Sequence, residues 1–529
     1  MHSPWRKAEV TEHPVCCRPE LRQPAARLLL AVLAFLALLP SALLSAPRWV
    51  KLQSPHFELF TGAETKEACR LLVQLENART YFIRSMGAPL PAAPLRVVSF
   101  GSDEEFDSFR SSAFAAGLYV GTPGGDYIVL KHATAAYLPM AIHEYSHHVM
   151  RYSGVRAPLW WQEGVAEVFS TINFMSDRVE VGAVPSGRYN SLKGQEWIKI
   201  STLLGIDRLS APMQDRRHAE LVYAESWALV HMLLLSDEYG NRRDGLMKRI
   251  AAGAGAVETF RDLYGKTPDQ VQADLESYVK QNQFGLIHSP VEVESPAPAL
   301  HATEATAFEL QLALANISLG VNRREQAVRI LTSLSRQYPD RWEVDEALAY
   351  LSWYAADRDG ARSYFGRAVE KGMANAKAYV HYAGLLGEVR AANSTLIPLV
   401  TKALELEPEN HQASLKLASL YLRDRRYQEV ISVVGQIAGI RPDEAFQAHL
   451  LQGYAHLGLG EIESARNAVG AAQPSARTEA ESAELERLSR SVSAREPASQ
   501  QIAPVSETAQ PANPARIEPS SSPVRMKGV

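Results

Sequence analysis

The chain has 529 residues, of which 46% are hydrophobic and 22% charged, and its formal net charge is -4. This length is too great for one ordinary core, so we expect two or three domains. The near-neutral charge gives no electrostatic basis for nucleic acid as a partner. With three cysteines, Cys16, Cys17 and Cys69, the sequence excludes a disulfide framework and a cysteine-based zinc site.

An uncharged apolar run occupies residues 28–46 and follows Arg18, Arg22 and Arg27. Positive charge before such a run predicts a cytoplasmic tail over residues 1–27 and an exported body. The run is long for a signal-peptide core and marginal for a spanning helix, and its possible cleavage sites after Ala42 and Ala46 have Pro40 or Leu44, not a small residue, at the third position back. We therefore expect a transmembrane anchor, with the body in the periplasm or exterior; a cleaved signal peptide, giving a secreted protein, remains the alternative.

Residues 49–285 show a mixed strand and helix pattern. WVKLQSPHFELFTG suggests an extended pair, LRVVSF an apolar strand, and AGLYV and DYIVL around GTPGG a hairpin or two edge strands. Helical patterns are predicted over 64–86, 139–152, 159–172, 217–238 and 268–281. Prolines then indicate a linker over 286–306. A proline-rich tail without aromatic residues, 493–529, is predicted to be disordered.

A repeat with a period near 34 residues begins after the linker. Two series of mostly small residues, each member of the second 12 positions after one of the first, carry it: Ala315, Ala349, Ala383, Ala418 and Gly453; and Ala327, Ala361, Thr395, Val430 and Ala465. Two helices per period and small residues at their contact are typical of tetratricopeptide repeats, predicted here over 307–476. A generic helical bundle is the alternative. The groove lined by the first helix of each repeat is the expected surface for a protein partner.

The segment IHEYSHHVM contains the pattern His143-Glu144-x-x-His147. Pro139 suits the first turn of a helix, so the pattern is expected within one helix. Residues four apart share a helical face, so both imidazoles can bind one metal ion, and Glu144 can take a proton from a metal-bound water. By itself the five-residue pattern is suggestive only.

A second predicted helix, APLWWQEGVAEVF, supplies carboxylates at Glu163 and Glu167. Catalytic zinc sites use three protein ligands, and Glu163 lies 16 residues after His147, enough for a helix end, a turn and a return. Glu167, one turn further, could accept the free ring N–H of a ligand histidine. Two carboxylates on a helix are often solvated surface, but the flanking tryptophans favour a buried helix, where unpaired carboxylates are costly. We therefore predict zinc bound by His143, His147 and Glu163.

HEYSHH followed by WWQEGVAEVF resembles the gluzincins, in particular the bacterial peptidase MA-like family, over roughly residues 49–282. SPHFELFTG and YAESWALVHMLL add to the resemblance. It implies an α+β zincin, thermolysin-like metallopeptidase domain, here followed by an all-α tetratricopeptide solenoid. Some gluzincins place a tyrosine about sixty residues after the glutamate ligand to bind the developing oxyanion. Tyr223 matches that interval; a core tyrosine is the alternative.

The sequence thus predicts an exported, membrane-anchored zinc metallopeptidase. A peptide or protein is the expected substrate, Glu144 and Tyr223 are the catalytic residues, and the added repeats bind a protein partner. An extended substrate could pair with AGLYV or DYIVL as an added strand. One alternative is an exported scaffold, weakly catalytic or inactive, that binds partners through the repeats. A zinc hydrolase acting on a non-peptide bond is another.

Overall fold

The structure is a computed structural model that describes residues 49–62, 64–110, 115–175, 177–290 and 300–495. Within these ranges, no helix has both the length and the apolar content that a membrane span requires. The predicted cytoplasmic tail 1–27, the predicted anchor or signal peptide 28–46 and all but the first three residues of the predicted tail 493–529 lie outside them.

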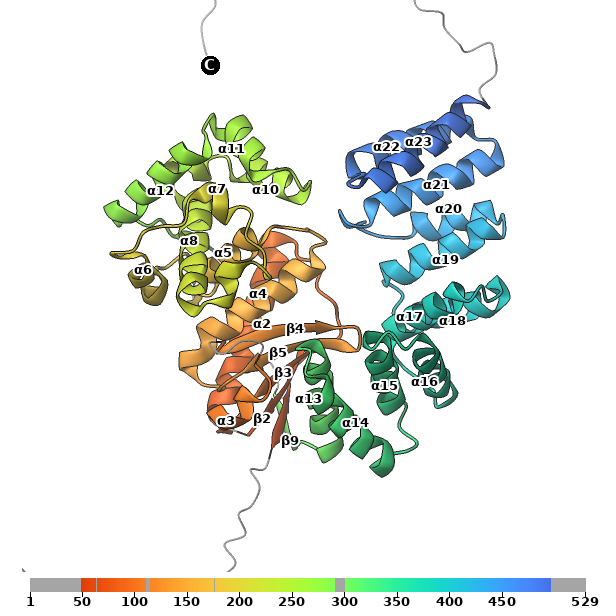
Figure 1. Ribbon diagram of the computed structural model, residues 1–529, viewed down its shortest axis with the longest axis horizontal. Helices are drawn as coiled ribbons and strands as arrows, with labels where there is room; N and C mark the ends of the chain where they lie inside the picture. The colour runs from red at the N-terminus through yellow and green to blue at the C-terminus, as the bar shows by residue number, and fades with distance from the viewer. Residues whose placement is uncertain (1–48, 63, 111–114, 176, 291–299, 496–529) are drawn as a thin grey trace, which may run out of the picture. The chain divides into compact units, whose positions relative to one another are not determined.

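A six-stranded mixed sheet with the order β4-β5-β3-β2-β1-β9 organises the N-terminal part (Figure 1). Its strands are β1 (Val50–Gln53), β2 (Phe57–Thr61), β3 (Leu95–Ser99), β4 (Gly117–Thr122), β5 (Gly125–Leu130) and β9 (His301–Glu304). β2, β3 and β5 run parallel, whereas β1, β4 and β9 pair antiparallel to their neighbours. The extended pair and the hairpin predicted from the sequence are both present, and β4 of that hairpin is an edge strand.

Helices α2 (Thr65–Met86) and α4 (Leu138–Tyr152) pack on this sheet and on each other. α2 buries an apolar face and ends at Gly87, whose φ of 61° suits glycine. α4 has Pro139 in its first turn, as predicted, where the missing N–H costs nothing. α5 (Leu159–Phe169) then packs on α4 and on the long α8 (Arg216–Leu235). The remaining elements of this part are α3 (Asp103–Asp107), η1 (Ala135–Tyr137), β6 (Asn173–Phe174), β7 (Val179–Val181), α6 (Ser186–Leu192), α7 (Ile200–Leu203), η2 (Ala211–Gln214), α9 (Asp237–Gly240), α10 (Arg243–Ala251), α11 (Ala256–Tyr264) and α12 (Pro268–Gln281).

The span predicted as a linker, 286–306, contains two strands. β8 (Ile287–Ser289) pairs with β7 in a small second sheet, and β9 pairs with β1 at the edge of the main sheet. The sequence pattern missed both because they are short, and β9 is exposed at all four positions. Both strands are stabilised by backbone hydrogen bonds to a neighbouring strand, and such pairing leaves no apolar periodicity in the sequence.

Five helix pairs follow, and a further helix packs on the last of them (Figure 1). The pairs are α13 (Ala307–Gly320) with α14 (Arg324–Gln337), α15 (Trp342–Tyr354) with α16 (Arg358–Glu370), α17 (Ala376–Glu388) with α18 (Asn393–Leu406), α19 (His411–Arg423) with α20 (Tyr427–Gly435), and α21 (Ala445–Leu459) with α22 (Ile462–Ala472). After η3 (Gln473–Ser475), α23 (Glu479–Ser493) extends the array beyond the predicted end at residue 476. Most of the small residues of the predicted repeat are buried between the paired helices, Ala315, Ala349 and Ala383 among them.

The turn within each pair repeats with the same period. One residue per turn has a positive φ, and the set is Asn322, Ala356, Arg390, Arg425 and Gly460. Their spacings of 34, 34, 35 and 35 match those of the small residues. A left-handed residue is unfavourable for Ala or Arg by about 1 kcal/mol, so its recurrence reflects one turn geometry imposed in every repeat. The C-terminal region is therefore a helical array of the tetratricopeptide type.

Candidate metal centre

Helix α4 carries His143 and His147 on one face, four residues apart as the sequence predicts. Their Nε2 atoms lie 3.3 Å apart, and the two rings meet edge to face. His143 is buried and His147 half-buried. Two imidazole nitrogens this close cannot both be protonated without repulsion, so the pair is suited to sharing a cation.

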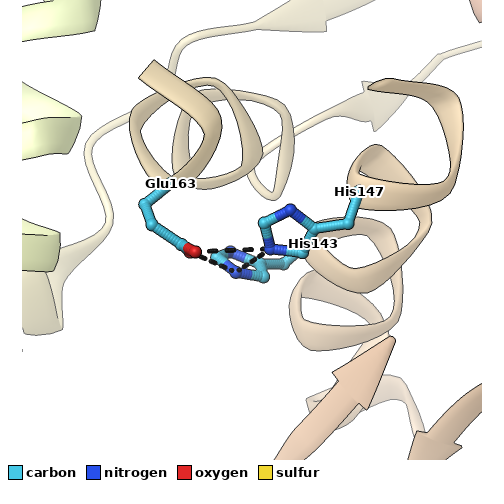
Figure 2. A group of neighbouring side chains, drawn as sticks. All are labelled: His143, His147 and Glu163. Atoms are coloured by element: carbon cyan, nitrogen blue, oxygen red, sulfur yellow. Dashed lines mark hydrogen bonds and ion pairs between the residues drawn. The ribbon is translucent and has the colours of Figure 1, made fainter. Parts of the chain in front are cut away.

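Helix α5 places Glu163 opposite the two histidines (Figure 2). Its Oε2 atom lies 3.4 Å from Nε2 of His143 and 3.5 Å from Nε2 of His147. Glu163 is 1% exposed. A carboxylate so deeply buried requires compensation by opposite charge. Within the described residues, this trio is the one group of His, Cys, Asp and Glu side chains close enough to hold a metal ion.

The separations of the three ligand atoms fit zinc. In a tetrahedral site with metal–ligand bonds of about 2.1 Å, any two ligand atoms lie roughly 3.4 Å apart. The three separations here are 3.3, 3.4 and 3.5 Å. Two imidazoles and one carboxylate are also the ligand types of a catalytic zinc site, which leaves a fourth position for water or substrate. Donor chemistry and spacing thus both suit this ion.

The ionisation of the trio follows from its contacts. Burial alone would raise the pKa of the Glu163 carboxyl, but His147, His143 and Arg208 together hold it well below its usual range. Burial would likewise lower the pKa of His143, yet the contact with Glu163 and the nearby carboxylates of Glu167 and Glu144 raise it to about 9. Metal binding would therefore displace a proton from this site.

Glu167 occupies the position expected for a carboxylate behind a ligand histidine. Its Oε1 atom lies 3.5 Å from Nδ1 of His143, the ring nitrogen that faces away from the trio. The same oxygen accepts hydrogen bonds from Nη2 and Nε of Arg188, at 2.6 and 2.9 Å. Arg188 therefore fixes the position of the Glu167 carboxylate, which can in turn orient the His143 ring.

Glu144 is buried beside the trio and is bound by the edge strand. Its Oε2 atom accepts a hydrogen bond of 2.7 Å from the backbone N–H of Tyr119 in β4. This hydrogen bond fixes the carboxylate between α4 and the sheet. The other predicted catalytic residue, Tyr223 on α8, is half-buried, with the Arg188 guanidinium 5.0 Å from its ring centroid. Burial and the Glu163 carboxylate raise the pKa of the Tyr223 phenol, which therefore remains a donor at neutral pH.

Two arginines of the site were missed by the sequence reasoning. Arg188, on α6, holds Glu167, and Arg208, between α7 and η2, donates from Nη2 to Oε1 of Glu163 at 2.9 Å. Neither arginine belongs to a recognisable sequence motif, because each lies on a different element from His143, His147 and Glu163. Arg208 engages the oxygen of Glu163 that does not face the histidines, so it also orients the carboxylate.

Gly164 allows α5 to approach α8 closely enough to present Glu163. A Cβ atom at this position would lie 2.3 Å from the Ser226 carbonyl oxygen and 2.4 Å from Cγ2 of Val230. We expect Gly164→Ala to lower the free energy of unfolding by about 1–3 kcal/mol, as overpacking of a well-filled core does. Denaturant unfolding measures this. Gly470→Ala in α22 is the control, because nothing beyond its own helix backbone lies within 4 Å of an added Cβ atom, and it should be neutral or stabilising. An equal loss of unfolding free energy in both variants would contradict the packing argument.

No protein-family model and no curated protein matches the sequence. Over about a third of its length, the structure is similar to solved structures. The likeness to YrrB, described as a TPR protein with an unusual peptide-binding site, covers 34% of this chain and 90% of YrrB, with 15% identity and a TM-score of 0.30. The likeness to MamA covers 37% of this chain and 97% of MamA, with 15% identity and a TM-score of 0.27. The likeness to pilF of Pseudomonas aeruginosa covers 36% of this chain and 88% of pilF, with 16% identity and a TM-score of 0.29. TM-scores this low carry no functional argument, and the description of the C-terminal region as a tetratricopeptide-type array rests on its own helix pairs and turns.

Proposed function

We propose that the N-terminal part of this chain is a zinc-dependent peptidase and that the attached repeats bind protein. The observation that carries the first half is the set of three separations, 3.3 to 3.5 Å, between Nε2 of His143, Nε2 of His147 and Oε2 of Glu163. They match the ligand spacing of tetrahedral zinc. The resemblance of this part to the peptidase MA-like gluzincins belongs to the same proposal.

The residues around the site have the chemistry that amide hydrolysis needs. When bound, zinc supplies Lewis acidity, which polarises a carbonyl and lowers the pKa of water. Glu144 takes a proton from the water whose oxygen attacks the scissile carbonyl carbon. The carbon–nitrogen bond then breaks, and Glu144 passes the proton to the leaving nitrogen. Tyr223, protonated at neutral pH, can donate a hydrogen bond to the oxyanion that forms.

Strand β4 offers a surface for an extended substrate. Of the two segments that the sequence offered for strand addition, DYIVL is interior to the sheet as β5, and only AGLYV lies at the edge, mainly as β4. The edge position leaves one side of β4 without a neighbouring strand in the sheet. Substrate binding by strand addition would therefore use β4.

The second candidate function is a scaffold that binds partners through the repeats without hydrolysis. The five helix pairs favour it, because arrays of this type expose an extended concave surface to their ligands. Its support is the array's own helix pairs and turns, because the solved structures described above have TM-scores too low to argue for either reading. Both readings allow a bound zinc, so zinc content cannot separate them.

Hydrolysis by the purified full chain separates them. We expect about one zinc per chain by elemental analysis. We also expect cleavage of an unstructured protein substrate that stops when a chelator removes the zinc and returns when zinc is restored. Zinc-loaded protein that cleaves no member of a diverse peptide library, while retaining partners on its repeats, would favour the scaffold.

A further inference from the structure

Hairpin β4–β5 is contacted by the first helices of the repeat array. The side-chain amide of Asn316 on α13 donates a hydrogen bond of 3.1 Å to the hydroxyl of Tyr127 on β5. Both residues are buried, and Tyr127 is 0% exposed. The hydroxyl also accepts a hydrogen bond of 3.3 Å from Nη1 of Arg96 on β3, so Asn316, 189 residues further along the chain, adds a second donor from the repeats.

The turn and the outer strand of the hairpin also pack against these helices, in ordinary contact at the turn and more tightly at the strand. A Cβ atom at Gly124, in the turn, would lie 3.5 to 3.8 Å from atoms of Asn316, Glu346 and Tyr350, which belong to α13 and α15. A Cβ atom at Gly320, the last residue of α13, would lie 2.2 Å from Cγ1 of Val120 in β4. The array therefore touches the hairpin at its tip and along β4.

A third repeat reaches the same hairpin through a polar chain. Nζ of Lys377 on α17 donates a hydrogen bond of 2.8 Å to the hydroxyl of Tyr152, the last residue of α4. That hydroxyl donates in turn to Oδ2 of Asp126 on β5, at 2.7 Å. Asp126 is buried, and these hydrogen bonds add to the compensation that Arg151 gives its carboxylate, with Nε of Arg151 3.7 Å from Oδ1.

These contacts reach Glu144 through a single strand. Val120, which Gly320 contacts, is the neighbour of Tyr119, and the Tyr119 N–H holds the Glu144 carboxylate. We propose that the first three repeats serve in cis as a holder for hairpin β4–β5 and thereby position Glu144, with Asn316 and Lys377 as positioning residues. The catalytic consequence rests on the proposed peptidase function, but the holding itself does not. A partner that displaces α13 would then change the active site.

The test uses the full chain and compares Gly320→Ala with Gly384→Ala. Gly384 is a helical glycine of α17 with no atom within 4 Å of an added Cβ. Alanine favours helix over glycine in both places, so any loosening in Gly320→Ala must come from the clash with β4. We expect amide hydrogen exchange of residues 117–122 to be on the order of ten-fold faster in Gly320→Ala and unchanged in Gly384→Ala. Exchange in β2 should be unchanged in both, which excludes general unfolding.

Lys377→Met provides a second variant that keeps the side-chain stem, and Lys402→Met on α18 is its control, because Lys402 pairs with Glu405 on its own helix. We expect amide hydrogen exchange of residues 117–122 to be faster in Lys377→Met and unchanged in Lys402→Met. Unchanged exchange in both Gly320→Ala and Lys377→Met would overturn the proposal. Where hydrolysis is measurable, both variants should lose kcat/KM at unchanged zinc content. A wild type that cleaves nothing refutes the peptidase function and leaves the exchange result standing.

Discussion

Glu144→Gln is expected to abolish hydrolysis while leaving zinc content and fold unchanged. The amide oxygen of glutamine can still accept the hydrogen bond from the Tyr119 N–H, so the contact between α4 and β4 is preserved. The amide cannot take the proton of the attacking water, however, and loss of a general base typically costs about 10²–10⁴-fold in rate. The measurement is kcat/KM on a cleaved peptide, together with elemental analysis and thermal unfolding.

Glu104→Gln is the matched control for this variant, because Glu104 is an exposed carboxylate of the short helix α3. It should have wild-type activity and zinc content. If Glu144→Gln turned over substrate at the wild-type rate, Glu144 would not be the base. If it lost zinc together with activity, the result would indicate a disturbed metal site and would leave the role of Glu144 undecided until a zinc-retaining variant such as Glu144→Asp were measured.

Glu163→Ala is expected to lose zinc. Three-ligand sites depend on each ligand, and even a residue that only orients a ligand costs about 10–100-fold in metal affinity when it is removed. We therefore expect the affinity to fall by at least roughly 100-fold, measured by competition with a chelator of known affinity. His143→Ala should behave in the same way, since its Nε2 atom belongs to the same trio.

Glu167→Ala serves as the comparison, because its carboxylate faces Nδ1 of His143 and not the trio. It should keep a full equivalent of zinc at saturation and lose affinity by only about 10–100-fold. The reverse result, full occupancy in Glu163→Ala and loss in Glu167→Ala, would make Glu167 the third ligand. Circular dichroism of both variants checks that the helices remain intact.

Much of the candidate site was predictable because its signals are local. His143 and His147 are placed together by the helical repeat alone, and a helix that begins near Pro158 brings Glu163 back after one turn. The tetratricopeptide array was predictable for a similar reason, since each pair contacts mainly its sequence neighbours and the same small residues recur at each contact. In both cases, spacing along the chain translates directly into position in space.

Only the tertiary structure determines which contacts form between the helices of the site, the sheet and the repeats. The donor that holds Glu144 is a backbone N–H, which every residue except proline carries and which therefore leaves no trace in the sequence. Arg208 and Arg188 reach the site from elements other than those that carry His143, His147 and Glu163. The contacts from Asn316 and Lys377 join residues 189 and 225 positions apart. Periodicity reports only neighbours within one element, so contacts over such distances depend on how the sheet and the repeats pack.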